Sequence, residues 1–182
     1  LSFMGAAYHN RVQSFPRLMN FDFKIWGTGW NLEAPLGRLV QNNNERLSSD
    51  EIVKIYNRAK INLNLHSSTY HYGINPDGDF VNPRTFEIAA CQGFQLVDSR
   101  NDLSRMFKIG EEIITFDTLD QMRDQIDYYL SRPEERNSIA LKAYHRVLSE
   151  HTMEHRMQEL LLHVFLDRKS ALDSIGENHR DP

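Results

Sequence analysis

The sequence predicts an α/β fold with a mostly parallel sheet and helices on both faces. Three observations lead to this fold class. Short apolar runs alternate with amphipathic segments along most of the chain, as strands alternate with crossover helices. Glycine ends the first two apolar runs, at Gly5 and Gly27. A long polar stretch, 66–81, follows a later run, and parallel sheets carry their ligand-binding loops after the strands.

The expected strands are short apolar runs, of which the third is the weakest: Leu1–Gly5, Phe23–Trp26, Leu36–Val40, Ile61–Leu65, Phe94–Val97 and Glu112–Phe116. The run at 61–65 reads Ile-Asn-Leu-Asn-Leu. This alternation is typical of a strand with one polar face, or of a strand beside an active cleft.

Helices are expected between these strands, at 8–18, from Ser48 or Ser49 onward, and at 82–93, 101–107, 119–130, from Pro133 onward and 152–168. Pro16 should shorten or bend the first of them, because proline interrupts the hydrogen bonds of a helix. The second begins with a serine cap and acidic residues in its first turn.

The composition is that of one globular domain followed by a short tail. The chain has 182 residues, and its sequence is polar from Lys169, which predicts a domain over 1–168 and a frayed tail over 169–182. The net charge of −4 argues against a nucleic-acid partner, and no apolar run reaches the roughly twenty residues of a membrane span. The single Cys91 favours the reducing cytoplasm. Because Leu1 already lies in strand-like sequence, we expect a fragment of a longer chain.

The helix that begins near Asn82 carries the clearest chemistry. Asn82 is a good N-cap, Pro83 suits the first helical position, and Gly93 is expected to end the helix in a left-handed conformation. Such a helix start attracts an anion such as a phosphate, and Arg84 in the first turn is easiest to explain if it shares that anion. Glu87, about one turn further along, can aim its carboxylate at neutral hydroxyls. A phosphate site beside a diol site is what a nucleotide needs.

Residues 82–94, Asn-Pro-Arg-Thr-Phe-Glu-Ile-Ala-Ala-Cys-Gln-Gly-Phe, resemble the nucleotide-binding helix of glycosyltransferases with two Rossmann-like halves, the GT-B fold. The closer resemblance is to the glycosyltransferase-like group that includes spore-maturation and spore-coat proteins. By element order the resemblance covers roughly 1–165. It implies a Rossmann-like, nucleotide-sugar-binding domain, the C-terminal half of a GT-B fold.

The resemblance also implies roles for single residues. Related retaining enzymes have a Glu-x7-Glu motif around this helix, in which the second Glu holds the ribose and the first lies near the donor sugar. Glu87 matches the second position, and Asp79 stands at the first, with a side chain shorter by one methylene. Asp79 is therefore the catalytic candidate, and Glu87 is the candidate ribose ligand.

The donor phosphates are expected to contact basic residues and glycines. Arg84 and the amides that begin the helix, from the N-cap to Thr85, would hold the diphosphate. Arg11 would join them, by analogy with related enzymes. Gly5 and Gly27 would let the backbone approach the ligand closely. Fixed positive groups can stabilise the leaving diphosphate in place of a metal ion, so no metal site is assigned and no further cofactor is required.

The leading functional hypothesis is the donor-binding domain of a glycosyltransferase. It would transfer a sugar from a nucleotide-diphosphate sugar to an unknown acceptor, with retention of configuration. The acceptor-binding domain would precede it in the same chain, so this fragment should bind nucleotide without transferring sugar. The alternative is a catalytically inactive module of the same fold, in surface or spore-coat assembly. A nicotinamide dehydrogenase half is disfavoured, because no Gly-x-Gly-x-x-Gly fingerprint follows either early strand.

Some aromatic side chains have more than one interpretation. The long loop contains four of them: His66, Tyr70, His71 and Tyr72. Metal ligation and polar contacts to a sugar or base are both open for this group. Trp26 and Trp30 are candidates for stacking on a base or covering a domain interface, and core packing is favoured for Trp26.

Overall fold

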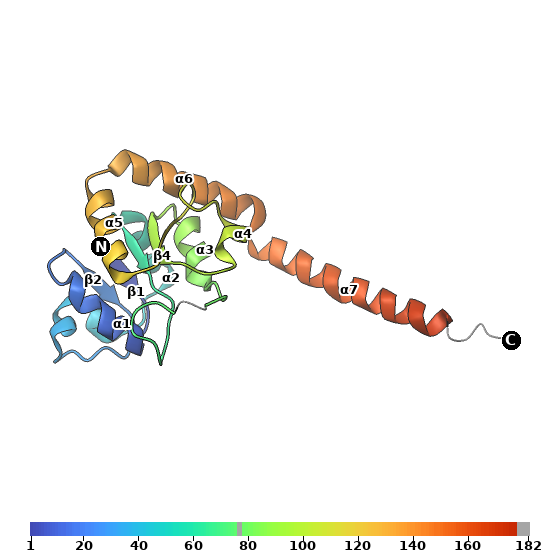
Figure 1. Cartoon of the computed structure of the whole chain (residues 1–182), viewed down its shortest axis with the longest axis horizontal. Helices are drawn as coiled ribbons and strands as arrows, with labels where there is room; N and C mark the ends of the chain where they lie inside the picture. The colour runs from blue at the N-terminus through green and yellow to red at the C-terminus, as the bar shows by residue number, and fades with distance from the viewer. Residues whose placement is uncertain (76–77, 178–182) are drawn as a thin grey trace.

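The structure is a computed structural model that describes residues 1–75 and 78–177, with side chains described as far as Leu166. A five-stranded parallel sheet forms its centre, and helices pack against it (Figure 1). The strands are short: β1 Ser2–Met4, β2 Lys24–Trp26, β3 Asn62–Asn64, β4 Gln95–Asp98 and β5 Ile114–Phe116. The predicted α/β fold class is confirmed.

The strands lie in the order β2-β1-β3-β4-β5, and each neighbouring pair is parallel. Phe3 of β1 lies opposite Ile25 of β2 and Leu63 of β3, and Leu63 in turn lies opposite Leu96 of β4. Because the order of the strands reverses between β1 and β3, the carboxyl ends of these two strands form the switch point where doubly wound sheets bind ligands.

Helices and short 3-10 turns connect the strands: α1 His9–Ser14, η1 Phe15–Leu18, η2 Pro35–Leu39, η3 Asn42–Asn44, α2 Ser49–Arg58, α3 Pro83–Ala90, α4 Leu103–Met106, α5 Leu119–Leu130, α6 Pro133–Glu150 and α7 Met153–Glu177. The change from α1 to η1 fits the expected effect of Pro16. Ser48 caps α2 and forms a capping box with Glu51.

Two clusters of buried side chains form the core. The larger includes Leu96 of β4 with Met122 and Ile126 of α5. The smaller includes the next strand residue, Val97, with Ala89 of α3. Successive residues of a strand point to opposite faces of the sheet, so these two clusters cover both faces, as the sequence predicted.

The prediction of a third strand over Leu36–Val40 is wrong, because all but the last of these residues lie in the 3-10 turn η2. Val40 alone makes an isolated bridge, with Ile25 of β2. A Cβ atom on Gly37 would lie 2.1 Å from the carbonyl oxygen of Leu32, so the backbone turns too tightly here for an extended strand.

The end of α3 also differs from the expectation. Gln92, rather than Gly93, adopts the left-handed conformation, with a φ of 54°. A Cβ atom on Gly93 would lie 2.8 Å from the side-chain nitrogen Nδ2 of Asn62 and 2.9 Å from the backbone carbonyl oxygen of Tyr56. Glycine is required at this position because the helix end packs closely against β3 and α2.

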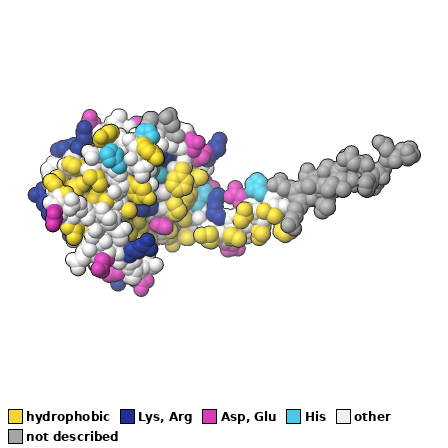
Figure 2. All heavy atoms as spheres, turned by 90° about the horizontal axis from the view of Figure 1, so that it is seen from below, with side chains coloured by type: hydrophobic (Ala, Val, Ile, Leu, Met, Phe, Trp, Pro, Cys, Tyr) yellow, Lys and Arg dark blue, Asp and Glu magenta, His cyan; other side chains and the backbone are white. Residues whose placement is uncertain are grey.

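Helix α7 continues to Glu177, past Arg168, where the sequence predicted its end. It projects away from the rest of the domain (Figure 1), and Figure 2 shows hydrophobic side chains along its described part. Large apolar side chains exposed on it are Met153, Met157, Leu160, Leu161, Leu162, Val164, Phe165 and Leu166. Residues 178–182 of the expected tail lie outside the described residues, and the boundary of the domain stays a prediction. Within the described ranges, no helix combines the length and apolarity needed to cross a membrane.

Candidate functional site

The carboxyl ends of β1 and β2 bring two of the predicted glycines into contact. The Gly5 amide donates to the carbonyl oxygen of Trp26 at 2.8 Å. Gly27 has a φ of 131°, and a Cβ atom there would lie 2.3 Å from the Gly5 carbonyl oxygen. Gly27 therefore has to be glycine because the backbone of Gly5 packs against it, whether or not a ligand approaches.

Two arginines from distant parts of the chain converge on Gly5. A Cβ atom on Gly5 would lie 3.1 Å from Nη2 of Arg84 and 3.2 Å from Nη1 of Arg11. Both guanidinium groups also lie over the ring of Phe3, with their Cζ atoms 5.0 Å (Arg11) and 5.7 Å (Arg84) from its centroid. The fold thus brings together three of the predicted site residues, one directly after β1, one from α1 and one from α3.

Arg11 is buried between the ends of β1 and β3. Its Nε and Nη2 donate to the Leu65 carbonyl oxygen at 3.0 and 2.8 Å, and its Nη1 donates to the carbonyl oxygen of Ala6 at 3.0 Å. Burial and the neighbouring positive charge of Arg84 lower the pKa of Arg11 to about 10, which leaves it protonated at neutral pH. Arg11 therefore holds a fixed positive charge at the switch point, while its hydrogen bonds go to the protein.

Arg84 and Glu87 of α3 both act on Tyr56 of α2. Burial raises the pKa of the Tyr56 hydroxyl to about 12, opposed by Arg84 and reinforced by the Glu87 carboxylate. Glu87 is exposed and Arg84 is half-buried. Burial and then Glu87 also raise the pKa of Cys91, so its thiol stays protonated and is a poor nucleophile.

The N-terminal end of α3 is capped as the sequence predicted. The side-chain oxygen of Asn82 accepts a hydrogen bond from the backbone amide of Thr85 at 3.1 Å, and the backbone amide of Asn82 donates to Nε2 of His66 at 2.9 Å. The Thr85 hydroxyl is buried and accepts from the Asn64 side chain at 2.9 Å. The side chains of Asn82 and Thr85 thus stabilise the helix start, and their contact with a diphosphate stays a prediction.

Asp79, the catalytic candidate, lies in the loop before α3. Its side chain is exposed, and Oδ1 accepts a hydrogen bond from the Asn101 side chain at 2.8 Å. This bond ties the loop to the segment that follows β4. The role of Asp79 stays a prediction.

The aromatic residues of the long loop separate into two environments. His66 is buried, and its Nδ1 lies 2.7 Å from Oδ1 of Asp98, whereas Tyr70, His71 and Tyr72 are exposed. Among the described residues, no group of three or more His, Cys, Asp or Glu side chains is placed to hold a metal ion. The sequence did not single out Asp98. The signal that could have found Asp98 is its place at the end of a strand. Because β3 and β4 are parallel neighbours, the end of β4 lies beside the residues that follow β3, which include His66.

The two tryptophans differ from the expectation. Trp30 is buried, lies 6.2 Å from Phe3 between ring centroids, and its indole N–H donates to the Gly5 carbonyl oxygen at 3.0 Å. Trp26 is half-buried and borders two cavities. Trp30 is therefore the tryptophan that packs in the core, and the prediction that Trp26 packs there was wrong.

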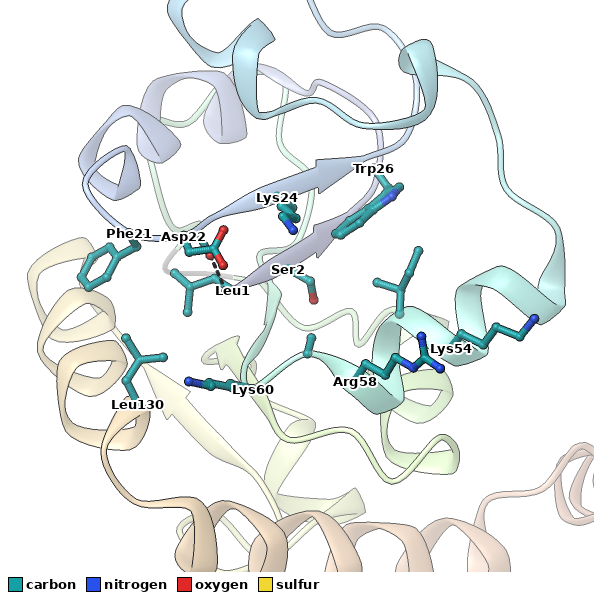
Figure 3. A pocket seen from close by; sticks show the side chains of 12 residues that line it. Leu1, Ser2, Phe21, Asp22, Lys24, Trp26, Lys54, Arg58, Lys60 and Leu130 are labelled. Carbon is teal, nitrogen blue, oxygen red and sulfur yellow. Dashed lines mark hydrogen bonds between the residues drawn. The ribbon is translucent and has the colours of Figure 1, made fainter.

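Two of the cavities lie beside β1 and β2, at opposite ends of these strands. The smaller, of about 310 Å³, opens at the carboxyl ends of β1 and β2 and is lined by Met4, Gly5, Ala6, Trp26, Gly27, Thr28, Arg46, Leu47 and Ile52. The larger, of about 710 Å³, lies at the amino ends of the strands, where Leu1, Lys24 and Lys60 border it (Figure 3). The predicted site residue Gly5 borders the smaller cavity.

Comparisons with known sequences identify the family of the chain. The protein family described as "Glycosyl transferase-like" matches residues 9–162 of the chain. The spore protein CgeB of Bacillus subtilis is 28% identical over 165 residues, which make up 85% of this chain and 50% of CgeB. The chain therefore spans half the length of this curated relative.

Solved structures share the fold at low sequence identity. An α,α-trehalose 6-phosphate synthase from Burkholderia multivorans matches all of this chain and 44% of its own, with a TM-score of 0.66 and 14% identity. The C-terminal domain of a glycosyl transferase group 1 family protein from Francisella tularensis has a TM-score of 0.59 and 14% identity, and the match covers 84% of this chain and 86% of that domain. The chain belongs to the glycosyl transferase-like family, and its fold is that of the C-terminal domain of a GT-B glycosyltransferase.

Proposed function

We propose that this domain binds the nucleotide-diphosphate sugar donor of a glycosyltransferase. The observation that carries the proposal is the convergence of Arg11 and Arg84 over Gly5 at the switch point of the sheet. Glu87 lies on the exposed side of the same helix as Arg84. Helix α3 thus holds both Arg84, one of the two cations of the anion site, and the Glu87 carboxylate in a fixed relation, which suits a ligand with a phosphate beside a diol.

The diphosphate lies over Gly5 in this proposal, between the two arginines. The lack of a side chain on Gly5 lets both guanidinium groups approach the end of β1, since a Cβ atom there would lie 3.1 Å from Nη2 of Arg84 and 3.2 Å from Nη1 of Arg11. Negative charge builds on the diphosphate as the glycosidic bond breaks, and fixed cations stabilise it without having to reorganise. The two guanidinium groups therefore take the place that a metal ion occupies in other transferases.

The nucleoside extends from there along the carboxyl edge. Glu87 accepts hydrogen bonds from the ribose hydroxyls, a charge-assisted arrangement that suits a carboxylate. The cavity of about 310 Å³ beside Gly5 receives the base, with apolar contacts from Trp26 and Ile52.

Catalysis requires a second domain in this proposal. Asp79 lies near the transferred sugar, and transfer proceeds with retention to an acceptor held by a domain N-terminal to this one. This chain by itself binds the donor without transferring sugar. A nucleotide-sugar substrate, together with a lone cysteine in the chain, favours a cytoplasmic location.

A non-catalytic module is the second candidate function. The observation that favours it is the similarity to CgeB, a spore protein. Such a module would keep the fold for surface or spore-coat assembly and would not need a nucleotide.

Calorimetric titration with UDP, GDP and ADP distinguishes the two functions. We expect at least one nucleotide to bind, with the same affinity in EDTA as in Mg²⁺, because the arginines supply the positive charge. Absence of binding to all three would favour the non-catalytic module. Binding that needs Mg²⁺ would contradict the proposed role of Arg11 and Arg84.

The substitution Glu87→Gln tests the ribose contact. It keeps the size and the helix but removes the charge, and we expect the affinity for the best nucleotide to fall about ten-fold. Glu111→Gln is the matched control, because Glu111 is exposed and precedes β5 at the opposite edge of the sheet. Equal affinities of the two variants would remove Glu87 from the site.

A further inference from the structure

His66 is a buried histidine whose two ring nitrogens both have partners within the protein. Nε2 lies 2.9 Å from the backbone nitrogen of Asn82, and Nδ1 lies 2.7 Å from Oδ1 of Asp98. A backbone N–H can only donate, so Nε2 has to be the unprotonated acceptor. Nδ1 therefore carries the proton and donates it to the carboxylate of Asp98.

Asp98 is held firmly enough to fix this tautomer. Its side chain is fully buried, and the same Oδ1 also accepts from the backbone amide of His66 at 2.8 Å. Its other oxygen accepts from Arg100, which is also buried. Both oxygens of this side chain act as acceptors toward these donors, so Asp98 selects the Nδ1–H form of the ring.

Asn82 is the point where this arrangement meets α3. Its backbone amide donates to His66, and its side-chain Nδ2 donates to Oδ1 of Asn64 in β3 at 2.9 Å. Its Oδ1 accepts from the backbone amide of Thr85 and so caps the helix. Pro83, the next residue, has no N–H to offer. The first turn of α3 is therefore tied to the ends of β3 and β4 through the side chains of His66 and Asn64.

We propose that His66 is a positioning residue that sets the N-terminal end of α3, and with it Arg84 and Glu87, through the acceptor nitrogen Nε2. Asp98 acts one step further away, by selecting the tautomer. The consequence for ligand affinity rests on the proposed nucleotide-binding function. The placement of the helix end does not, and it is measured separately below.

Two substitutions separate the two bonds of the ring. In His66→Gln the side-chain amide reaches the place of Nε2 and keeps an acceptor for Asn82. In His66→Asn the amide stays near the place of Nδ1 and keeps a donor for Asp98 only. Each variant loses one buried hydrogen bond of the ring. If His66 only stabilised the fold, nucleotide affinity would therefore fall by a similar factor in both variants.

Nucleotide affinity is the first measurement. We expect His66→Gln to bind the best nucleotide nearly as well as the wild-type chain, and His66→Asn to bind it about ten-fold more weakly. Equal affinities in the two variants, or weaker binding by His66→Gln, would overturn the proposal.

NMR of the chain without nucleotide is the second measurement, and it decides the placement even if no nucleotide binds. In the wild-type chain at neutral pH, the ¹⁵N signals should identify Nε2 of His66 as unprotonated and Nδ1 as protonated. The Asn82 and Arg84 amide signals should move in His66→Asn and stay close to wild type in His66→Gln. The opposite tautomer, or equal movement in both variants, would overturn the proposal. Normal NMR results together with no nucleotide binding would instead refute the proposed function.

Discussion

At the scale of single residues, Tyr56 reports on the charged groups of the candidate site. It is buried on α2, and its hydroxyl experiences both Arg84 and Glu87 of α3. Its pKa is raised to about 12 by burial first, so the folded protein keeps the phenol neutral where an unfolded chain would ionise it.

This shift predicts a loss of stability in alkaline solution. A pKa raised above its unfolded value stabilises the fold fully below about pH 10, and that contribution is lost as the pH rises toward 12. We expect Tyr56→Phe to lack this part of the decline, about 1.4 kcal/mol per pH unit. Urea unfolding of both proteins between neutral pH and pH 11 measures the difference, since all other titrating groups are common to them.

The exposed Tyr70 provides the control for this measurement. Tyr70→Phe should follow the wild-type curve. If Tyr56→Phe follows it as well, the hydroxyl of Tyr56 is not desolvated in the folded protein.

At the scale of elements, α2 is positioned by its N-terminal capping box. Oγ of Ser48 accepts from the Glu51 amide, and the Glu51 carboxylate accepts from the Ser48 amide at 3.0 Å. The helix then places Tyr56 against α3, while Ile52 lines the cavity proposed for the base. The cap is therefore a determinant of the shape of the site as well as of stability.

Ser48→Ala should cost about 1 kcal/mol of unfolding free energy, because it leaves the Glu51 amide without its side-chain acceptor. Ser49→Ala, at the first helical position and exposed, is the matched control and should be close to neutral. Equilibrium urea unfolding measures both. A larger loss in Ser49→Ala would mean that the helix begins one residue later.

The contrast between these elements explains how much of the fold could be predicted. Local signals were sufficient for α2 and for the start of α3, because capping residues and apolar spacing act within a few residues. The turn η2 was missed because Leu36, Leu39 and Val40 form a short apolar run of strand length, although the i, i+3 spacing of the two leucines fits a helical turn better. The tight packing of Gly37 against Leu32 decides the backbone.

At the scale of the whole molecule, the body of the domain is stabilised without α7. Among the described side chains, no residue of α7 belongs to either core cluster. The last strong contacts before it are those of His151, whose ring lies 5.2 Å from that of Phe86 and whose Nε2 lies 2.8 Å from the Met106 carbonyl oxygen.

A chain ended after Thr152 should therefore keep its thermal midpoint within a few degrees of the full chain, because surface deletions that spare the core cost little. Differential scanning calorimetry measures this, and nucleotide affinity should also be unchanged. His151→Ala in the full chain is the comparison, and it should lower the midpoint more than the truncation does. A large loss on truncation would show that α7 packs against the domain.

The sequence by itself determined the fold class, most of the strands and the identity of the helix that carries Arg84 and Glu87. These follow from apolar periodicity and capping chemistry, which depend on near neighbours. Only the tertiary structure decided that Arg11 meets Arg84 over Gly5, and that His66 joins Asp98, 32 residues away, to the start of α3. The order of strands in a parallel sheet decides which strand ends are neighbours, and this order depends on how the whole core packs rather than on any local pattern.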